Sequence, residues 1–87
     1  MVTAEQIKTY IEGGLACDYV RVLGDDGEHF EAMVVSPDFT GKNTVKQHQL
    51  VYQALGHRMG GEIHALALKT FTPEEWKVKG GNESVAG

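Results

Sequence analysis

The sequence predicts a single α+β domain, a three-stranded mixed sheet with its helices packed on one face. Three observations predict this class. A chain of 87 residues allows one domain. Its hydrophobic fraction of 41% and its charged fraction of 23% are ordinary for a globular protein. Helix-like and strand-like apolar patterns follow one another in the order helix, strand, strand, helix, strand, helix.

The first element is a helix predicted over residues 4–13. Thr3 and Gln6 fit a capping box, in which each side chain accepts a hydrogen bond from the other residue's backbone N–H. The apolar residues that follow recur at helical spacing until Gly13 and Gly14 end the pattern. Thr3 is therefore the predicted N-cap.

A β-hairpin is predicted next. Its strands are residues 19–23 and 29–35, where β-forming residues dominate and the side chains of the second run alternate between two faces. The turn signal Gly-Asp-Asp-Gly at residues 24–27 separates the two runs. Because the connection is short, the two strands are expected to pair antiparallel.

A long helix is predicted over residues 44–59, with Asn43 or Thr44 as its cap. Gly60 and Gly61 follow it, and glycine suits the left-handed position at a helix end. The stripe predicted to face the core consists of Val45, His48, Val51, Tyr52, Leu55 and Met59.

Two short elements complete the predicted fold. The continuous apolar run Ile63–Leu68 predicts a buried strand, because it is too short for a helix. Thr72–Glu75 forms a second capping box with proline at the first helical position, which opens a helix through Trp76. A right-handed crossover makes the last strand parallel to the second, and the αββαβα topology is the class II KH-like arrangement. Residues 1–79 are the predicted domain, and the Gly-rich residues 80–87 are a predicted disordered tail.

The charge distribution argues against a general phosphate binder, since the net charge is −4. Only residues 37–61 are locally basic, and Lys42 and Lys46 lie there beside a helix start, which makes a candidate phosphate site. A solvated loop with a helix cap is the other interpretation. The Gly-x-x-Gly loop with which KH domains clamp nucleic acid is absent. Nucleic-acid binding is therefore the alternative function.

The single cysteine, Cys17, excludes an intramolecular disulfide and a metal cage made of cysteines alone. No apolar run of 18 residues and no signal-peptide pattern occurs, so we expect a cytoplasmic protein that does not enter a membrane. Cys17 has no basic or histidine neighbour to lower its pKa, which favours a half-buried structural role over a reductase or thiol enzyme. No P-loop, G-x-S-x-G or H-E-x-x-H motif occurs either, and we expect no enzyme.

Four histidines remain as candidate ligands. His48 lies on the predicted apolar stripe and is interpreted as a core-edge residue, and His57 lies on the other side of that helix. His29 and His64 open two strands next to turn or Gly-rich segments, where they can reach solvent, a metal or a partner. Two histidines do not complete a tetrahedral site, so a metal here needs ligands from another molecule.

Four segments resemble the BolA family in order and spacing over about residues 3–77. They are Phe39-Thr40-Gly41-Lys42, Val45 to Leu55 (VKQHQLVYQAL), Ile63 to Thr70 (IHALALKT) and Thr72 to Trp76 (TPEEW). The combination of the last two is the most specific. The short, acidic form is most similar to the bacterial acid-stress branch of the family, which is linked to stress response and transcription regulation.

The resemblance implies a non-enzymatic role on the αββαβα fold. BolA-like proteins form heterodimers with monothiol glutaredoxins and share a [2Fe–2S] cluster that glutathione also ligates, so the isolated chain would carry no cofactor. His64, in its His-Ala-Leu context, matches the family's C-terminal ligand. His29 matches the second ligand of members with a histidine in the first hairpin loop, whereas Asp26 stands near the cysteine of other members, and Cys17 lies outside that loop. A DNA complex and a weak homodimer stay open as further assemblies.

Overall fold

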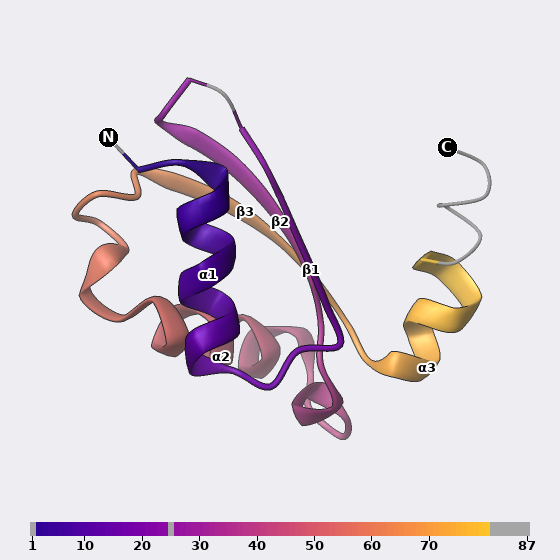
Figure 1. Ribbon diagram of the computed structural model, residues 1–87. Coiled ribbons are helices and arrows are strands. Elements are labelled where there is room, and N and C mark those ends of the chain that lie inside the picture. The colour runs from indigo at the N-terminus through magenta and orange to yellow at the C-terminus, as the bar shows by residue number, and fades with distance from the viewer. Residues whose placement is uncertain (1, 25, 81–87) are drawn as a thin grey trace.

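The computed structural model describes residues 2–24 and 26–80, and its elements follow in the predicted order (Figure 1). The helices and strands are α1 (Ala4–Gly14), β1 (Tyr19–Leu23), β2 (His29–Val35), α2 (Thr44–Leu55), β3 (Ala65–Phe71) and α3 (Pro73–Glu75). Short 3₁₀ turns lie at Pro37–Phe39 and Gly56–Arg58, and α3 continues as a π-helical turn, Trp76–Gly80. Residues 81–87 of the predicted tail lie outside the described residues.

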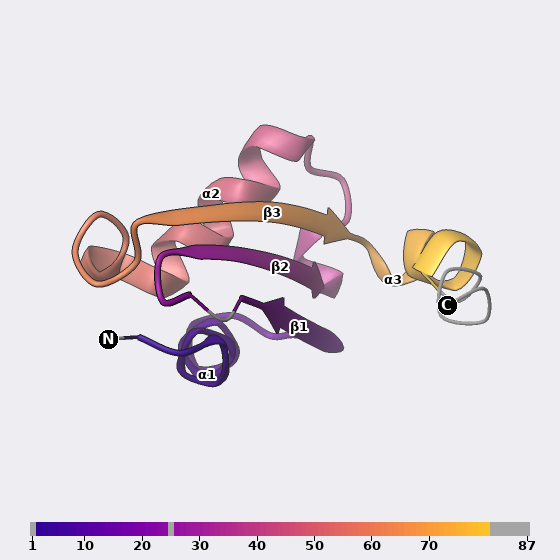
Figure 2. The same cartoon turned by 90° about the horizontal axis from the view of Figure 1, so that it is seen from above.

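The three strands form one sheet in the order β1-β2-β3 (Figure 2). β1 and β2 pair antiparallel, with Tyr19 opposite Val35, as the short turn predicts. β2 and β3 pair parallel, with His29 opposite Ala65, which confirms the predicted crossover through α2. Both capping boxes are present as well, with Thr3 and Thr72 as N-caps.

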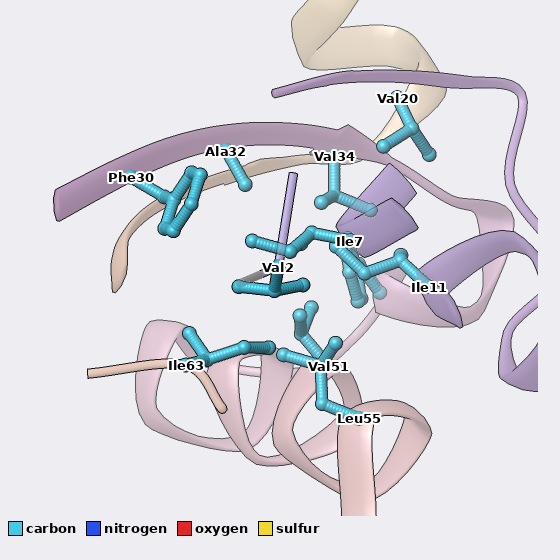
Figure 3. Close-up of a cluster of buried hydrophobic side chains, with 11 residues drawn as sticks. Val2, Ile7, Ile11, Val20, Phe30, Ala32, Val34, Val51, Leu55 and Ile63 are labelled. Carbon is cyan, nitrogen blue, oxygen red and sulfur yellow. The ribbon is translucent and has the colours of Figure 1, made fainter. Parts of the chain in front are cut away.

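The hydrophobic core lies between one face of the sheet and the helices α1 and α2 (Figure 3). Apolar side chains of alternate strand positions meet the inner faces of both helices, which removes them from water and supplies the main driving force for folding. The core residues are Val2, Ile7, Ile11, Val20, Phe30, Ala32, Val34, Phe39, Val51, Leu55 and Ile63. In the part of the chain that is described, no helix is long and apolar enough to cross a membrane.

α3 lies beyond the end of β3, away from α1 and α2 (Figures 1 and 2). Trp76, the residue after it, stacks on Tyr19 with ring centroids 5.0 Å apart and packs against Phe71 at 5.4 Å. In the strand register Tyr19, Val35 and Phe71 lie side by side, out of step with the core positions Val20 and Val34. Trp76 therefore packs on one end of the outer face of the sheet, so the prediction that the helices pack on one face holds for α1 and α2 and is wrong for the C-terminal helical segment.

The predicted end of the long helix is wrong. α2 ends at Leu55, because Gly56 adopts a left-handed φ of 60° and its N–H closes the last turn on the Tyr52 carbonyl. The 3₁₀ turn Gly56–Arg58 carries the chain onward in place of further α-helix.

The predicted core stripe of this helix is partly wrong as well. Val51 and Leu55 are buried and His48 is half-buried, but Val45 is 65% exposed and Tyr52 is 40% exposed. Gln47 takes the remaining buried position, one turn before Val51. The helix is turned this way because the Gln47 amide satisfies polar groups of two other segments, which a hydrophobic pattern does not reveal.

The apolar run at residues 63–68 predicts the third strand two residues too early and predicts too much burial. Ile63 is fully buried, but it belongs to an isolated bridge with Met59, and β3 begins only at Ala65. Within β3 exposed and half-buried residues alternate through Thr70. The reason is that β3 is an edge strand, and among the described residues of its outer face only Phe71, at its end, is covered by Trp76.

Candidate metal-binding site

The turn before β2 holds His29 in place through a single carboxylate. Asp26 Oδ1 accepts hydrogen bonds from the backbone N–H of Glu28 at 2.9 Å and of His29 at 2.8 Å. Asp26 Oδ2 lies 2.9 Å from the Nδ1 atom of the His29 ring. Asp is favoured in turns because its side chain can bond to nearby backbone in this way. Here the same side chain also engages the imidazole.

The Asp26 carboxylate and the His29 ring shift each other's pKa in opposite directions. Hydrogen bonds from the His29 backbone and ring, together with that from the Glu28 backbone, hold the pKa of Asp26 well below its usual range. The hydrogen bond to Asp26 raises the pKa of His29 above its usual value. Even so the His29 side chain is 73% exposed, so a partner molecule can reach it.

His64 reaches the same end of the sheet from the neighbouring strand. It is exposed and directly precedes β3, whose first residue, Ala65, lies opposite His29 and donates its N–H to the Glu28 carbonyl at 3.1 Å. The fold therefore brings the two predicted ligands, which lie far apart in the sequence, to adjacent strand ends.

The donor set at this end is incomplete for a metal. Among the described residues, no group of three or more His, Cys, Asp or Glu side chains could hold an ion. The two exposed imidazoles, one of them backed by a carboxylate, are the donor types and supporting groups found at metal sites. They lie at adjacent strand ends, and a metal held there would need further ligands from another molecule.

The outer face of the sheet next to His29 is uncovered. A shallow hollow of about 360 Å³ opens there. It is lined by Leu23, Gly24, His29, Phe30, Glu31, Ala65 and Ala67. The continuous apolar run of β3 concealed this surface at the sequence level. The sequence feature that could have indicated this surface is the pair of small residues at alternate positions, Ala65 and Ala67, both of which are exposed.

Cys17 lies at the other end of the sheet. It precedes β1, whose first residue, Tyr19, is opposite Val35, the last residue of β2. The thiol is half-buried and donates to the Leu15 carbonyl at 3.3 Å. Burial, followed by the nearby acidic groups Glu12, Asp18 and Asp38, raises its pKa to about 11. These facts support the structural role over a thiolate-based enzyme.

The predicted lysine pair also lies away from the histidines. Lys42 and Lys46 are exposed at the start of α2, where the Asn43 side chain caps the helix by accepting from the Lys46 N–H at 2.9 Å. Gln47, which sequence reasoning missed, donates its amide to the Lys42 carbonyl at 2.8 Å. It also accepts from the Thr70 hydroxyl at 2.7 Å, so this loop is tied to the second half of β3.

Fold and site together define an αββαβα domain with an open sheet face and two exposed histidines at one end. The chain belongs to the BolA-like family, because the model of that family, described as BolA-like protein, matches residues 15–75.

Individual relatives support this assignment. A Haemophilus influenzae protein named DNA-binding transcriptional regulator BolA is 49% identical over 66% of this chain and 53% of its own length. The Arabidopsis thaliana Protein BOLA2 is 40% identical over 88% of this chain and 86% of its own. The solved structure of a bolA protein homologue from Coxiella burnetii is 49% identical, covers 88% of this chain and 99% of that one, and superposes with a TM-score of 0.76.

The chain is shorter than some of its curated relatives. The match spans 53% of the Haemophilus influenzae protein and 58% of the human BolA-like protein 1.

Proposed function

We propose that this chain is a non-enzymatic adaptor that shares a glutathione-ligated [2Fe–2S] cluster with a monothiol glutaredoxin. The observation that carries the proposal is the placement of His29 and His64 at adjacent, exposed strand ends, with the His29 ring held by Asp26. The family resemblance supplies the class of partner. A reducing, cytoplasmic setting is part of the proposal and is supported by the single cysteine.

The donor chemistry explains why a partner is required. An iron–sulfur cluster is held mainly by thiolates, and the one thiol of this chain lies at the opposite end of the sheet with a raised pKa. The glutaredoxin and glutathione would therefore supply the thiolates, and His29 and His64 would supply imidazole nitrogens. Histidine ligation of one iron raises the reduction potential of a [2Fe–2S] cluster relative to four thiolates.

Reconstitution of the heterodimer tests this proposal. The chain, a monothiol glutaredoxin, glutathione, iron and sulfide are combined, and visible absorption and circular dichroism are recorded over time. We expect His64→Ala and His29→Ala each to change the visible dichroism and to shorten the lifetime of the cluster. His57→Ala is the matched control, because His57 is an exposed histidine outside the strand ends. A His64→Ala spectrum and lifetime equal to those of the wild type would reject the ligand assignment.

Nucleic-acid binding is the second candidate function. The Haemophilus influenzae, Escherichia coli and Vibrio cholerae relatives are named DNA-binding transcriptional regulator BolA. In this chain the candidate contacts are Lys42 and Lys46, exposed at the start of α2, where a helix N-terminus also favours phosphate.

Titration of duplex DNA at several salt concentrations tests the second candidate. Replacing Lys42 and Lys46 with glutamine should weaken binding and reduce the salt dependence by about one ion per lost phosphate contact. Lys8→Gln with Lys69→Gln removes the same charge elsewhere and is the control. No binding at low salt, or equal weakening by both double variants, would reject the Lys42 and Lys46 site.

A further inference from the structure

We infer that Asp26 is a positioning residue for the histidine site, because it fixes the His29 imidazole as the Nδ1–H tautomer and leaves the Nε2 lone pair for a metal. This inference rests on the proposed function, since it assumes that His29 is a ligand. It goes beyond the proposed function in two ways. It assigns a role to Asp26, which is not itself a ligand, and it specifies Nε2 as the atom of His29 that binds the metal.

The two oxygens of the Asp26 carboxylate contact different groups. Oδ1 accepts the backbone N–H groups of Glu28 and His29 and so closes the turn. Oδ2 lies within hydrogen-bond distance of the ring, 2.9 Å from Nδ1. No hydrogen bond to Nε2 occurs among the described residues. The turn and the ring are therefore held by one side chain through separate atoms.

The chemistry of the pair then selects the tautomer. A neutral imidazole has one nitrogen that donates and one that accepts. An ionised carboxylate can only accept, and Asp26 Oδ1 already accepts from two backbone N–H groups. Nδ1 must therefore carry the proton, which makes Nε2 the accepting, metal-binding nitrogen. Carboxylates behind metal-binding histidines commonly have this function.

The contact between Asp26 and the His29 ring is exposed to solvent, which bears on whether it serves folding or metal binding. A surface hydrogen bond between two side chains contributes little to folding, so the Oδ2 contact is not needed for stability. The turn is already closed by Oδ1. An immobilised ring also loses less conformational entropy when a partner docks against it.

Asp26→Asn separates the two functions of this side chain. The amide oxygen of asparagine can still accept the two backbone N–H groups, so the turn is retained. The amide nitrogen can only donate, so toward Nδ1 it favours the opposite tautomer, with the proton on Nε2. Glu28→Gln is the matched control, because it removes a neighbouring negative charge without a hydrogen bond to the ring.

The first readout is ¹⁵N NMR of the isolated chain labelled at histidine, at a pH of about 9, where imidazole is neutral. We expect Nδ1–H for His29 in the wild type and in Glu28→Gln, and a shift toward Nε2–H in Asp26→Asn. Backbone amide shifts outside the turn should stay unchanged. Nε2–H in the wild type, or the same tautomer in Asp26→Asn as in the wild type, would overturn the inference.

The second readout is the lifetime of the cluster in the reconstituted heterodimer. Loss of such a supporting group commonly weakens metal binding by about 10–100-fold. We therefore expect Asp26→Asn to shorten the lifetime markedly and Glu28→Gln to leave it near the wild-type value. A wild-type lifetime in Asp26→Asn rejects the positioning role, and the proposed function stands if His29→Ala still shortens it. A wild-type lifetime in His29→Ala rejects His29 as a ligand, and the inference with it.

Discussion

Cys17 is a residue whose surroundings determine its chemistry. Its pKa of about 11 means that at pH 8 the thiol is protonated, and that the thiolate fraction rises as the pH rises toward that value. We predict that iodoacetamide alkylates Cys17 at least about tenfold more slowly in the native chain than in urea. Two pKa units reduce the thiolate about 100-fold, and the greater nucleophilicity of a high-pKa thiolate offsets part of this.

Alkylation followed by mass spectrometry checks this prediction, with the urea-unfolded chain as the control. The native rate should increase steadily between pH 8 and pH 10. Equal native and unfolded rates at pH 8 would mean that the thiol is not protected, and they would reopen the hypothesis of a reactive cysteine.

Gln47 is the polar residue on which the local packing of α2 depends. Its side chain bonds to the Phe39 and Lys42 carbonyls and to the Thr70 hydroxyl. We predict that Gln47→Ala lowers the free energy of unfolding by about 2 kcal/mol, because three hydrogen bonds of a buried side chain are lost together with its packing. Gln53→Ala, at an exposed position of the same helix, should change it by less than about 0.5 kcal/mol. Urea unfolding measures both, and equal effects would contradict this account of Gln47.

The histidine site shows what can be predicted from sequence at the scale of residues. His29 and His64 are recognisable because they begin strand-like runs beside turns and match a family pattern. The role of Asp26 is hidden, because a Gly-Asp-Asp-Gly sequence predicts a turn whichever group the carboxylate also contacts. The burial of Gln47 is hidden for a similar reason, since its partners lie on a loop and on a distant strand.

At the scale of elements, α1 and α2 approach closely where Gly14 faces Ala54. A Cβ at Gly14 would lie 2.8 Å from the Cα and Cβ of Ala54, whereas a Cβ at Gly13 would meet nothing within 4 Å. We predict that Gly14→Ala destabilises the fold by about 1–3 kcal/mol through overpacking. Gly13→Ala should stabilise it by about 0.5–1 kcal/mol, because alanine is the better helix former. Thermal unfolding of both variants tests this, and a stabilising Gly14→Ala would contradict the packing.

The boundaries of helices and strands are only partly predictable from the hydrophobic pattern. Helix starts are correct because Thr3 and Thr72 encode their caps locally, and both hairpin strands are correct because a short turn fixes them. The predicted end of α2 is wrong because Gly56, which lies inside the apolar pattern, already adopts a positive φ four residues before Gly60, which also has one. The start of β3 is wrong because a continuous apolar run does not show which of its residues pair with a neighbouring strand.

At the scale of the whole molecule, the two candidate functions use opposite ends of one sheet. The histidines lie at the start of β2 and β3, and the lysine loop is bonded to Thr70 near the end of β3. We predict that replacement of Lys42 and Lys46 leaves the cluster lifetime unchanged, and that His64→Ala leaves any DNA affinity unchanged. Reconstitution and DNA titration with both variants measure this. A loss of both activities in either variant would mean that the two surfaces are not independent.

The central claim is that this chain supplies imidazole nitrogens to iron, and pulsed electron paramagnetic resonance of the reduced heterodimer tests it most directly. Only the histidines of this chain are labelled with ¹⁵N, and the glutaredoxin is left unlabelled. We predict strong ¹⁵N couplings from two nitrogens, one of which is lost in His64→Ala and the other in His29→Ala. A cluster that forms in the heterodimer without strong ¹⁵N coupling would contradict the claim.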